Sequence, residues 1–266
     1  MLTQEEKIRI DSIVRSHLTG FANGFSGRHI GEMENPEGVI NLKKQNIFIN
    51  KLPVEFMYYS ALVRSFDSSF GSVLEGLALE IARTNYQVSQ KVIGQIDSRQ
   101  RDLINDILTS YKNRTFTPEV RHYADYHTTP FSLSNASHAS DHLLFDEANN
   151  TYHIIELKAS GYLDIKKSEV EKRALLEQYF ILKNGKQNPN IKLHFAAAYN
   201  RFGEGNNWIQ PTVESFFARE ELLIGKDFWN FVCKDENGFD AIIEAYNSNL
   251  HIITHALEAI KEAYGI

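Results

Sequence analysis

The chain has 266 residues, of which 42% are apolar, 23% charged and 12% aromatic, and its formal net charge at pH 7 is −6. This composition is that of a globular protein with a full core, and no apolar run approaches the roughly 20 residues of a membrane span. Cys233 is the only cysteine, which excludes an internal disulfide framework and a thiolate zinc site.

The net acidity argues against nucleic acid as a partner, but the charge is unevenly distributed. Residues 214–266 carry ten acids and four bases, whereas residues 158–201 carry nine bases and four acids. The basic stretch is either a surface for phosphate or an ordinary solvated helix face. No secretory signal is visible in the polar, acidic start of the chain, so we expect a cytoplasmic protein.

Helical patterns dominate the first 112 residues. A helix capped by Thr3 is predicted to end near Leu18, before a loop region rich in Gly and Asn. Two further helices are predicted over 54–64 and 69–83, and a third from about Ser98 to Tyr111. Residues 113–140 show no clear period, which indicates loop and strand.

The middle of the chain is the most strand-like part. Residues 142–145 and 151–157 flank a turn-forming cluster, a pattern typical of a β-hairpin. A helix is predicted over 166–182 and a buried strand over 192–198, which favours a parallel crossover. Two helices, 239–246 and 250–264, close a chain of α/β class. We expect one domain, 1–266, with a mainly helical part (1–112), a sheet core (113–213) and C-terminal helices (214–266).

Side chains alternate between the two faces along the second hairpin strand, so Glu156 and Lys158 share a face with Ile154. A turn centred between Asp146 and Thr151 places Asp141 opposite Glu156. Facing Cβ atoms lie about 4.5–5.5 Å apart, where two carboxylates repel unless a cation separates them.

A hard divalent ion suits this carboxylate pair. Mg²⁺ prefers oxygen ligands and commonly takes one or two protein carboxylates, which leaves coordination positions for phosphate. A lysine beside the metal orients the attacking water and neutralises charge that develops on the phosphoryl group. Phosphodiester hydrolysis is therefore predicted for Asp141, Glu156 and Lys158. The competing interpretation is a surface ion pair on a hairpin.

The residues Ser140-Asp141-His142 and Ile154-Ile155-Glu156-Leu157-Lys158-Ala159, with the helix that follows, resemble the PD-(D/E)XK nuclease core. Ser140 stands where that pattern has proline, a departure that leaves the metal ligand in place. The resemblance implies a restriction-endonuclease-like fold: a mixed central β-sheet flanked by helices, with helical additions at both termini. It implies Mg²⁺, replaceable by Mn²⁺, held by Asp141, Glu156 and the backbone carbonyl of Leu157.

The stretch 65–75 and the start of the chain are similar to type II restriction endonucleases of the TdeIII and MjaII type. This similarity implies a prokaryotic homodimer that cuts both strands of a short palindrome, of GGNCC type, beside a cognate DNA methyltransferase. The sequence has no Walker-type run, and the pair Gly203 and Gly205 lacks the third glycine of a dinucleotide loop, so no nucleotide cofactor is expected. A structure-specific or repair nuclease and a non-catalytic DNA-binding module are the alternatives.

Further candidates come from the flanking helices. Superfamily members carry an acidic residue on a helix before the core, and Glu75 matches that position, with Glu80 as its rival and an exposed glutamate as the ordinary alternative. Gln178 is similar to a glutamine on the helix behind the active site, or is a half-buried polar residue. The DNA contacts are predicted to come from a set of basic and amide residues: Lys166, Lys167, Lys172, Arg173, Arg201 and Asn200.

Histidine pairs and the aromatic residues near the C-terminus have simpler interpretations. His138 with His142, and His251 with His255, could each supply two zinc ligands, but neither pair has a third, so structural roles are expected. Trp229 is expected in the core.

Overall fold

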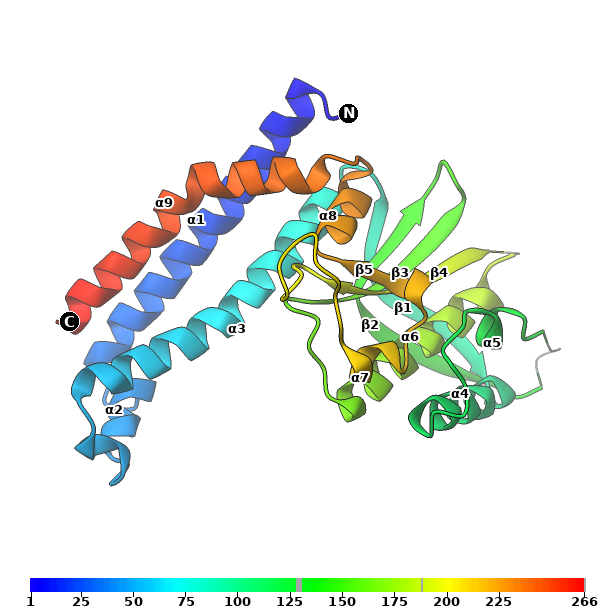
Figure 1. Cartoon of the computed structure of the whole chain (residues 1–266), viewed down its shortest axis with the longest axis horizontal. Coiled ribbons are helices and arrows are strands. Elements are labelled where there is room, and N and C mark those ends of the chain that lie inside the picture. The colour runs from blue at the N-terminus through cyan, green and yellow to red at the C-terminus, as the bar shows by residue number, and fades with distance from the viewer. Residues whose placement is uncertain (128–130, 188, 266) are drawn as a thin grey trace. The chain divides into compact units, whose positions relative to one another are not determined.

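The computed structural model describes residues 1–127, 131–187 and 189–265, and the chain divides into two compact units (Figure 1). The helical unit comprises residues 1–77 and 240–266, and the sheet unit comprises residues 78–239. Helix α3 (Val54–Ala82) contributes to both units. No helix within the described ranges is long and apolar enough to cross a membrane.

The helical unit is built from three long helices. They are α1 (Gln4–Glu34), the first part of α3, and α9 (Gly238–Tyr264), with the short helix α2 (Val39–Lys44) and the 3₁₀ turn η1 (Ile49–Lys51) before α3. Aromatic packing joins them: the rings of Tyr58 and Tyr264 stack with centroids 4.6 Å apart, and Phe25 meets Phe66 edge-on at 5.7 Å.

Helix α1 begins at the predicted capping box, where the Thr3 side chain accepts a hydrogen bond from the backbone N–H of Glu6. It does not end near Leu18, as the glycine content suggested, but continues to Glu34. The reason is packing, because Ala22, Phe25 and His29 keep the helical period and are buried. Burial of an apolar face outweighs the propensity cost of the glycines.

The sheet unit contains five strands in the order β1-β2-β3-β4-β5. The strands are β1 (Gln87–Asp97), β2 (Leu133–Asp146), β3 (Thr151–Lys158), β4 (Asn190–Ala197) and β5 (Leu222–Ile224). The first two pairings are antiparallel and the last two parallel. This is a mixed sheet flanked by helices, as expected for a restriction-endonuclease-like core.

Helices cover both faces of the sheet (Figure 1). Helices α4 (Ser98–Lys112) and α6 (Ile165–Gly185) pack on the face that carries Ile154, whereas Phe231 of α8 (Lys226–Cys233) packs on the face that carries His153. Three short elements complete the unit: α5 (Arg121–Ala124), α7 (Pro211–Glu214) and the 3₁₀ turn η2 (Arg219–Glu221).

Several elements differ from the sequence-based expectation. The hairpin, the crossover helix and the parallel strand are confirmed, but β1, β5 and α8 were not predicted. The helices predicted over 54–64 and 69–83 are one continuous helix, and so are those over 239–246 and 250–264. Trp229 lies in the core at 3% exposure and donates a hydrogen bond to the carbonyl of Ala198, as expected.

Candidate active site

Strand β3 presents one polar pair on the face covered by α6. Ile154 is fully buried there, and the side chains of Glu156 and Lys158 follow on the same face with 13% and 32% exposure. Ile155 and Leu157 face the opposite side and are buried. The alternation is as predicted, and it brings a carboxylate and an ammonium to the end of the strand, where α6 leaves the face partly open.

The hairpin register is also as predicted. His142 pairs with Ile155 and Leu143 with Ile154, so one further step along the same register is Asp141 beside Glu156. The backbone of Asp141 belongs to β2, while its side chain lies outside the described part of the structure. Its position relative to Glu156 remains a prediction from the register.

A bulge interrupts β2 at this point. Between the pairs Ser89–Leu143 and Lys91–Ala139, β1 advances two residues while β2 advances four. Bulges bend a strand and re-aim its side chains, and they are common beside active sites. The irregularity therefore falls on the segment of β2 that contains Asp141, a feature that the sequence pattern did not reveal.

The ammonium of Lys158 is held between two carboxylates. It forms ion pairs with Glu156 and, at 3.2 Å, with Glu171 of α6. Burial favours the neutral amine, but the two negative charges and their hydrogen bonds outweigh it, so the pKa of Lys158 is raised above its ordinary value. Lys158 therefore carries a positive charge near pH 7.

Sequence reasoning did not single out Glu171. The available signal was helical spacing, because Glu171, Leu175 and Gln178 recur at i, i+4 and i+7 on α6 and therefore share the face that meets the sheet. Leu175 and Gln178 are 1% and 2% exposed, which confirms that face as the inner one. Glu171 contacts the predicted catalytic lysine from there.

The donor set fits a hard divalent cation. Glu156 and Glu171 bring two described carboxylates to one ammonium, and Asp141 is the next register position on β2. Carboxylate oxygens are the ligands that Mg²⁺ prefers. Among the described residues, which exclude the side chain of Asp141, no group of three or more His, Cys, Asp or Glu side chains is placed to hold a metal.

Lys172, which lies on α6, has a different environment from Lys158. The Lys172 side chain is 1% exposed and is paired with Glu221, which is equally buried. Glu221 also accepts hydrogen bonds from the Tyr123 hydroxyl at 2.7 Å and the backbone N–H of Ala218 at 2.7 Å. Burial lowers the pKa of Lys172, and the charge of Glu221 opposes that effect. The predicted DNA contact at Lys172 does not fit this burial, because the ammonium is enclosed and already paired.

A family model for the type II restriction endonuclease HinfI matches residues 6–249 of the chain. The chain belongs to this family. It is a type II site-specific deoxyribonuclease, and its substrate is DNA. No curated protein and no solved structure matches the chain.

In this HinfI-family enzyme three other predicted basic residues, Lys166, Lys167 and Arg173, lie on α6. Lys166 and Lys167 are exposed in the first turn, which Asp164 caps by accepting a hydrogen bond from the Lys167 backbone N–H at 2.8 Å. Arg173 is partly exposed and donates to the Asn105 side chain at 2.6 Å. All three side chains are on the outer part of the helix, where a phosphate could meet them.

The loop after β4 contains two residues predicted to contact DNA, Asn200 and Arg201, whose environments differ. Arg201 is exposed and lies over the ring of Tyr162, 4.8 Å from its centroid. Asn200 is 8% exposed and organises the loop, because its amide donates to the Asn206 carbonyl at 2.7 Å and accepts from the Phe202 N–H at 3.0 Å. Arg201 remains a candidate contact, whereas the position of Asn200 indicates a loop-stabilising residue.

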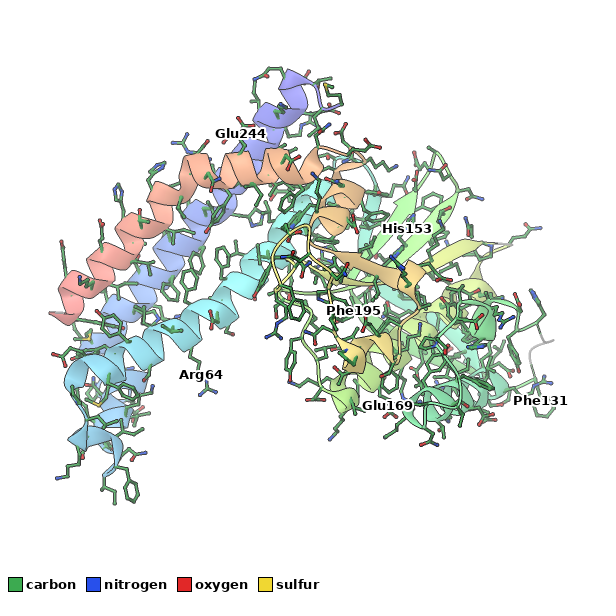
Figure 2. The ribbon with its side chains drawn as sticks, in the orientation of Figure 1. Arg64, Phe131, His153, Glu169, Phe195 and Glu244 are labelled. Carbon is green, nitrogen blue, oxygen red and sulfur yellow. The ribbon has the colours of Figure 1, made fainter. Side chains whose placement is uncertain are left out.

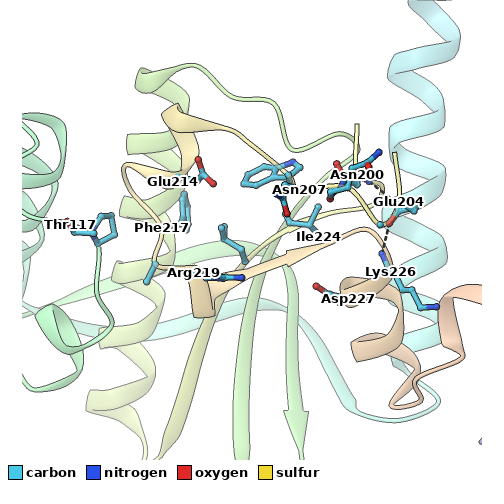
Figure 3. Close-up of a pocket in the computed structure, with 16 residues that line it drawn as sticks. Thr117, Asn200, Glu204, Asn207, Glu214, Phe217, Arg219, Ile224, Lys226 and Asp227 are labelled. Carbon is cyan, nitrogen blue, oxygen red and sulfur yellow. Dashed lines mark hydrogen bonds between the residues drawn. The ribbon is translucent and has the colours of Figure 1, made fainter. Parts of the chain in front are cut away.

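The same loop forms one wall of a pocket of about 820 Å³ (Figure 3). Glu204 fixes this wall by accepting hydrogen bonds from the backbone N–H groups of Asn200 at 2.7 Å and Lys226 at 3.1 Å. Ile224 lines the other side, and it pairs with Ala197, which in turn pairs with Lys158. The pocket wall therefore begins two strands from Lys158, about 10 Å away.

The remaining predicted residues lie on helices. Glu75 is exposed on the part of α3 that belongs to the helical unit. Its rival Glu80 is partly buried on the part of α3 that belongs to the sheet unit. Gln178 is buried, and within the described structure its Oε1 atom has no hydrogen-bond donor. The glutamine faces the same side of α6 as Glu171.

The histidines near the site make protein contacts. His138 pairs with Glu177 of α6 at 2.8 Å. On the opposite face of the sheet, ring nitrogens of His153 and His194 lie 3.0 Å apart. Burial lowers the pKa of His153 to about 4 and that of His194 to about 3. Both rings are neutral near pH 7 and pack against Phe231.

Proposed function

We propose that this enzyme hydrolyses phosphodiester bonds of double-stranded DNA at a PD-(D/E)XK site formed by Asp141, Glu156 and Lys158. The observation that carries the proposal is the Lys158 ammonium held by Glu156 and Glu171 at the open end of β3. A surface ion pair does not require a second carboxylate brought in from α6. The arrangement suits a site that handles a charged substrate.

Asp141, Glu156 and the backbone carbonyl of Leu157 are the proposed ligands of Mg²⁺, and Mn²⁺ is expected to substitute. When bound, the ion supplies a Lewis acid for the phosphate and acidifies the attacking water. Lys158 is protonated in this state, so it orients the water and stabilises negative charge on the phosphoryl oxygens through its N–H groups. Water adds to phosphorus, the bond to the leaving deoxyribose oxygen breaks, and the proton lost by the water is balanced by the proton that the leaving oxygen gains.

The outer part of α6 and the loop after β4 are the proposed DNA surface. Lys166 and Lys167 stand at the N-terminus of α6, where the helix dipole also favours an anion. Arg173, which is partly exposed, and Arg201, which is exposed, are the other bases proposed for this surface. These contacts would position the backbone of DNA without reading its sequence.

Cleavage of both strands at a short palindrome requires two active sites related by two-fold symmetry, so we propose a homodimer. A GGNCC-type recognition site is proposed only from the similarity of residues 65–75 to TdeIII and MjaII type enzymes, whereas the family model that matches the chain is that of HinfI. A cognate DNA methyltransferase is the expected genetic partner, because the host sites must be protected.

Cleavage of a plasmid in Mg²⁺, in Mn²⁺ and in EDTA tests the proposal. Discrete fragments with both metals and none in EDTA are expected, and run-off sequencing of the ends then gives the recognition site and cut position. Glu156→Ala should abolish cleavage while DNA binding is retained or improved. Glu119→Ala is the control, because Glu119 forms an exposed ion pair with Arg121 away from the site.

Cleavage by folded Glu156→Ala at the unsubstituted rate would refute the assigned site. Preferential cutting of branched or nicked DNA would instead favour a structure-specific nuclease. Discrete ends at a sequence other than GGNCC would contradict the proposed recognition sequence. They would not contradict the proposed active site.

A further inference from the structure

The loops that follow β3 and β4 leave the same end of the sheet, next to Lys158. The pairing of the two strands continues past their ends, because the N–H of Ala198 donates to the Lys158 carbonyl at 3.0 Å. The N–H of Tyr199 likewise donates to the carbonyl of Ala159 at 3.2 Å. In open α/β sheets, ligands bind outside the carboxyl ends of the parallel strands, which is where these two loops begin.

Two aromatic rings in these loops are exposed and share one cation. Tyr162 is 62% exposed and Phe202 is 44% exposed, whereas Phe195 of β4 is fully buried. The guanidinium carbon of Arg201 lies 4.8 Å from the centroid of the Tyr162 ring and 5.7 Å from that of Phe202. Tyr162, Arg201 and Phe202 together form the ring–arginine cluster.

The backbone around the cluster is held by specific contacts. Asn200 accepts a hydrogen bond from the backbone N–H of Phe202 at 3.0 Å. Gly161 makes the turn before Tyr162 with a φ of +70°, and a Cβ added to it would lie 2.9 Å from the Cβ of Ala197. Because the fold already orders both loops, the two rings offer contact area at a low cost in conformational entropy.

The chemistry of the cluster indicates the kind of partner. Among the residues that the structure describes, Arg201 has no carboxylate partner. A phosphate alone requires a cation but no ring, and an apolar protein surface requires rings but no cation. A nucleotide uses both, because its base stacks on an aromatic ring while its phosphate meets the arginine. DNA, the substrate of this family, supplies such nucleotides.

A similar contact elsewhere in the sheet unit shows what distinguishes the cluster. The Arg99 guanidinium lies 5.1 Å from the centroid of the Phe131 ring, whose side chain is 79% exposed. Arg99 also pairs with Asp97 at 3.5 Å, so its charge is balanced within the protein. Figure 2 shows Phe131 at the edge of the sheet unit, away from Phe195 of β4. An exposed ring beside an arginine is therefore not specific by itself, and Phe131 provides a matched control.

We infer that the ring–arginine cluster binds one DNA base that has left the helical stack, close to the bond that is cut. The inference rests on the proposed active site at Lys158. Tyr162 is four residues from Lys158, so their Cα atoms are at most about 14 Å apart. This span equals about four base-pair steps of 3.4 Å. Neighbouring bases cover both faces of a base inside the duplex, so only an unstacked base lies flat on one of these rings.

Chemical footprinting of the bound duplex tests this inference. Chloroacetaldehyde modifies adenine and cytosine only where they are unpaired, so each base pair is reported by one of its two bases. The duplex carries the site found by run-off sequencing, and Ca²⁺ replaces Mg²⁺ so that the duplex stays intact. We expect a reactive base pair within four nucleotides of the cut. The double variant Tyr162→Ala with Phe202→Ala should reduce its reactivity about tenfold, and Phe131→Ala should leave it unchanged.

Affinity measurements on the same duplex separate stacking from charge. Tyr162→Ala should weaken binding about tenfold without changing its salt dependence, because no phosphate contact is lost. Tyr162→Phe keeps the ring and should bind like the unsubstituted enzyme. Arg201→Gln should lower the slope of log K against log salt concentration by about one. Circular dichroism shows whether each variant is folded.

Two results would overturn the inference: a bound duplex with no unpaired base within four nucleotides of the cut, or a double variant that unpairs this base as well as the unsubstituted enzyme does. The test of the active site is separate. An unpaired base in an enzyme whose Glu156→Ala variant still cuts would support the cluster and contradict the proposed site. Loss of cleavage in Glu156→Ala without an unpaired base would do the reverse.

Discussion

The two lysine–carboxylate sites to which α6 contributes differ mainly in exposure. Lys172 is 1% exposed and paired with an equally buried Glu221, whereas Lys158 is 32% exposed and shared between Glu156 and Glu171. In the first site every charge has a partner inside the protein. In the second the ammonium borders on solvent, where a substrate can reach it.

Because of this difference we expect the Lys172 pair to act in stability and the Lys158 site to act in chemistry. A buried ion pair that loses one member leaves an uncompensated charge in the protein interior, so it governs stability. A partly exposed cation beside carboxylates governs what the surface can bind and stabilise. Both lysines belong to the same basic stretch of the sequence, which therefore does not distinguish them.

The largest expected effect in the comparison is on stability. Glu221→Gln removes the charge that balances buried Lys172, and we expect it to lower the free energy of unfolding by about 3–5 kcal/mol. Urea denaturation followed by circular dichroism measures the change.

The double variant Lys172→Met with Glu221→Leu is the control for this prediction. Because it removes both charges, it should recover most of the lost stability. A Glu221→Gln variant within about 1 kcal/mol of the unsubstituted enzyme would show that the buried pair has little structural importance.

A smaller effect is expected at Glu171, the second carboxylate that pairs with Lys158. Glu171→Gln removes one of the charges that hold Lys158, so kcat should fall about tenfold while KM changes little. Glu169→Gln is a matched control: its side chain has the same 22% exposure, and it pairs with Lys112 at 2.8 Å. Steady-state cleavage of a short duplex measures both. Equal losses in the two variants would exclude a positioning role for Glu171.

The smallest effect concerns a third lysine–carboxylate contact, at the hairpin turn. The hydrogen bond from Lys234 lowers the pKa of Asp146 to about 2. A depressed carboxyl pKa stabilises the fold above the unfolded value of about 3.9, and this contribution is lost as the pH falls towards 2. Lys234→Met should therefore reduce stability by less than about 1 kcal/mol at pH 7, because Lys234 is partly exposed.

The pH series distinguishes this contact from a general loss of stability. The difference between Lys234→Met and the unsubstituted enzyme should shrink between pH 4 and pH 2, where protonation removes the charge of Asp146. Thermal unfolding across this range provides the measurement. A difference that is constant with pH would show that the charge pair is not its cause.

The hairpin and crossover were predictable because local patterns specify them. Alternation in β3 placed Glu156 and Lys158 on one face, and the turn residues fixed the register that pairs His142 with Ile155. These features depend on residues close together in sequence. The proposed roles of Asp141, Glu156 and Lys158 rest on the same local reasoning.

Features set by distant contacts were not predictable. The glycines after Leu18 indicated a loop, but packing of Phe25 against α3 and α9 extends the helix to Glu34. The burial of Lys172 depends on Glu221, 49 positions away in the sequence. A sequence pattern gives the charge of a side chain, whereas its burial depends on which distant segment folds over it.

The central claim is that Lys158 serves catalysis and Lys172 serves stability. The most direct test makes the same substitution at both positions and measures single-turnover cleavage and urea denaturation in parallel. Lys158→Met should slow cleavage by about 10³-fold, with unfolding free energy changed by less than about 1 kcal/mol. Lys172→Met should lose about 3 kcal/mol of stability, while its folded fraction cuts at close to the unsubstituted rate. Cleavage that survives Lys158→Met, or that is abolished in stably folded Lys172→Met, would contradict the account.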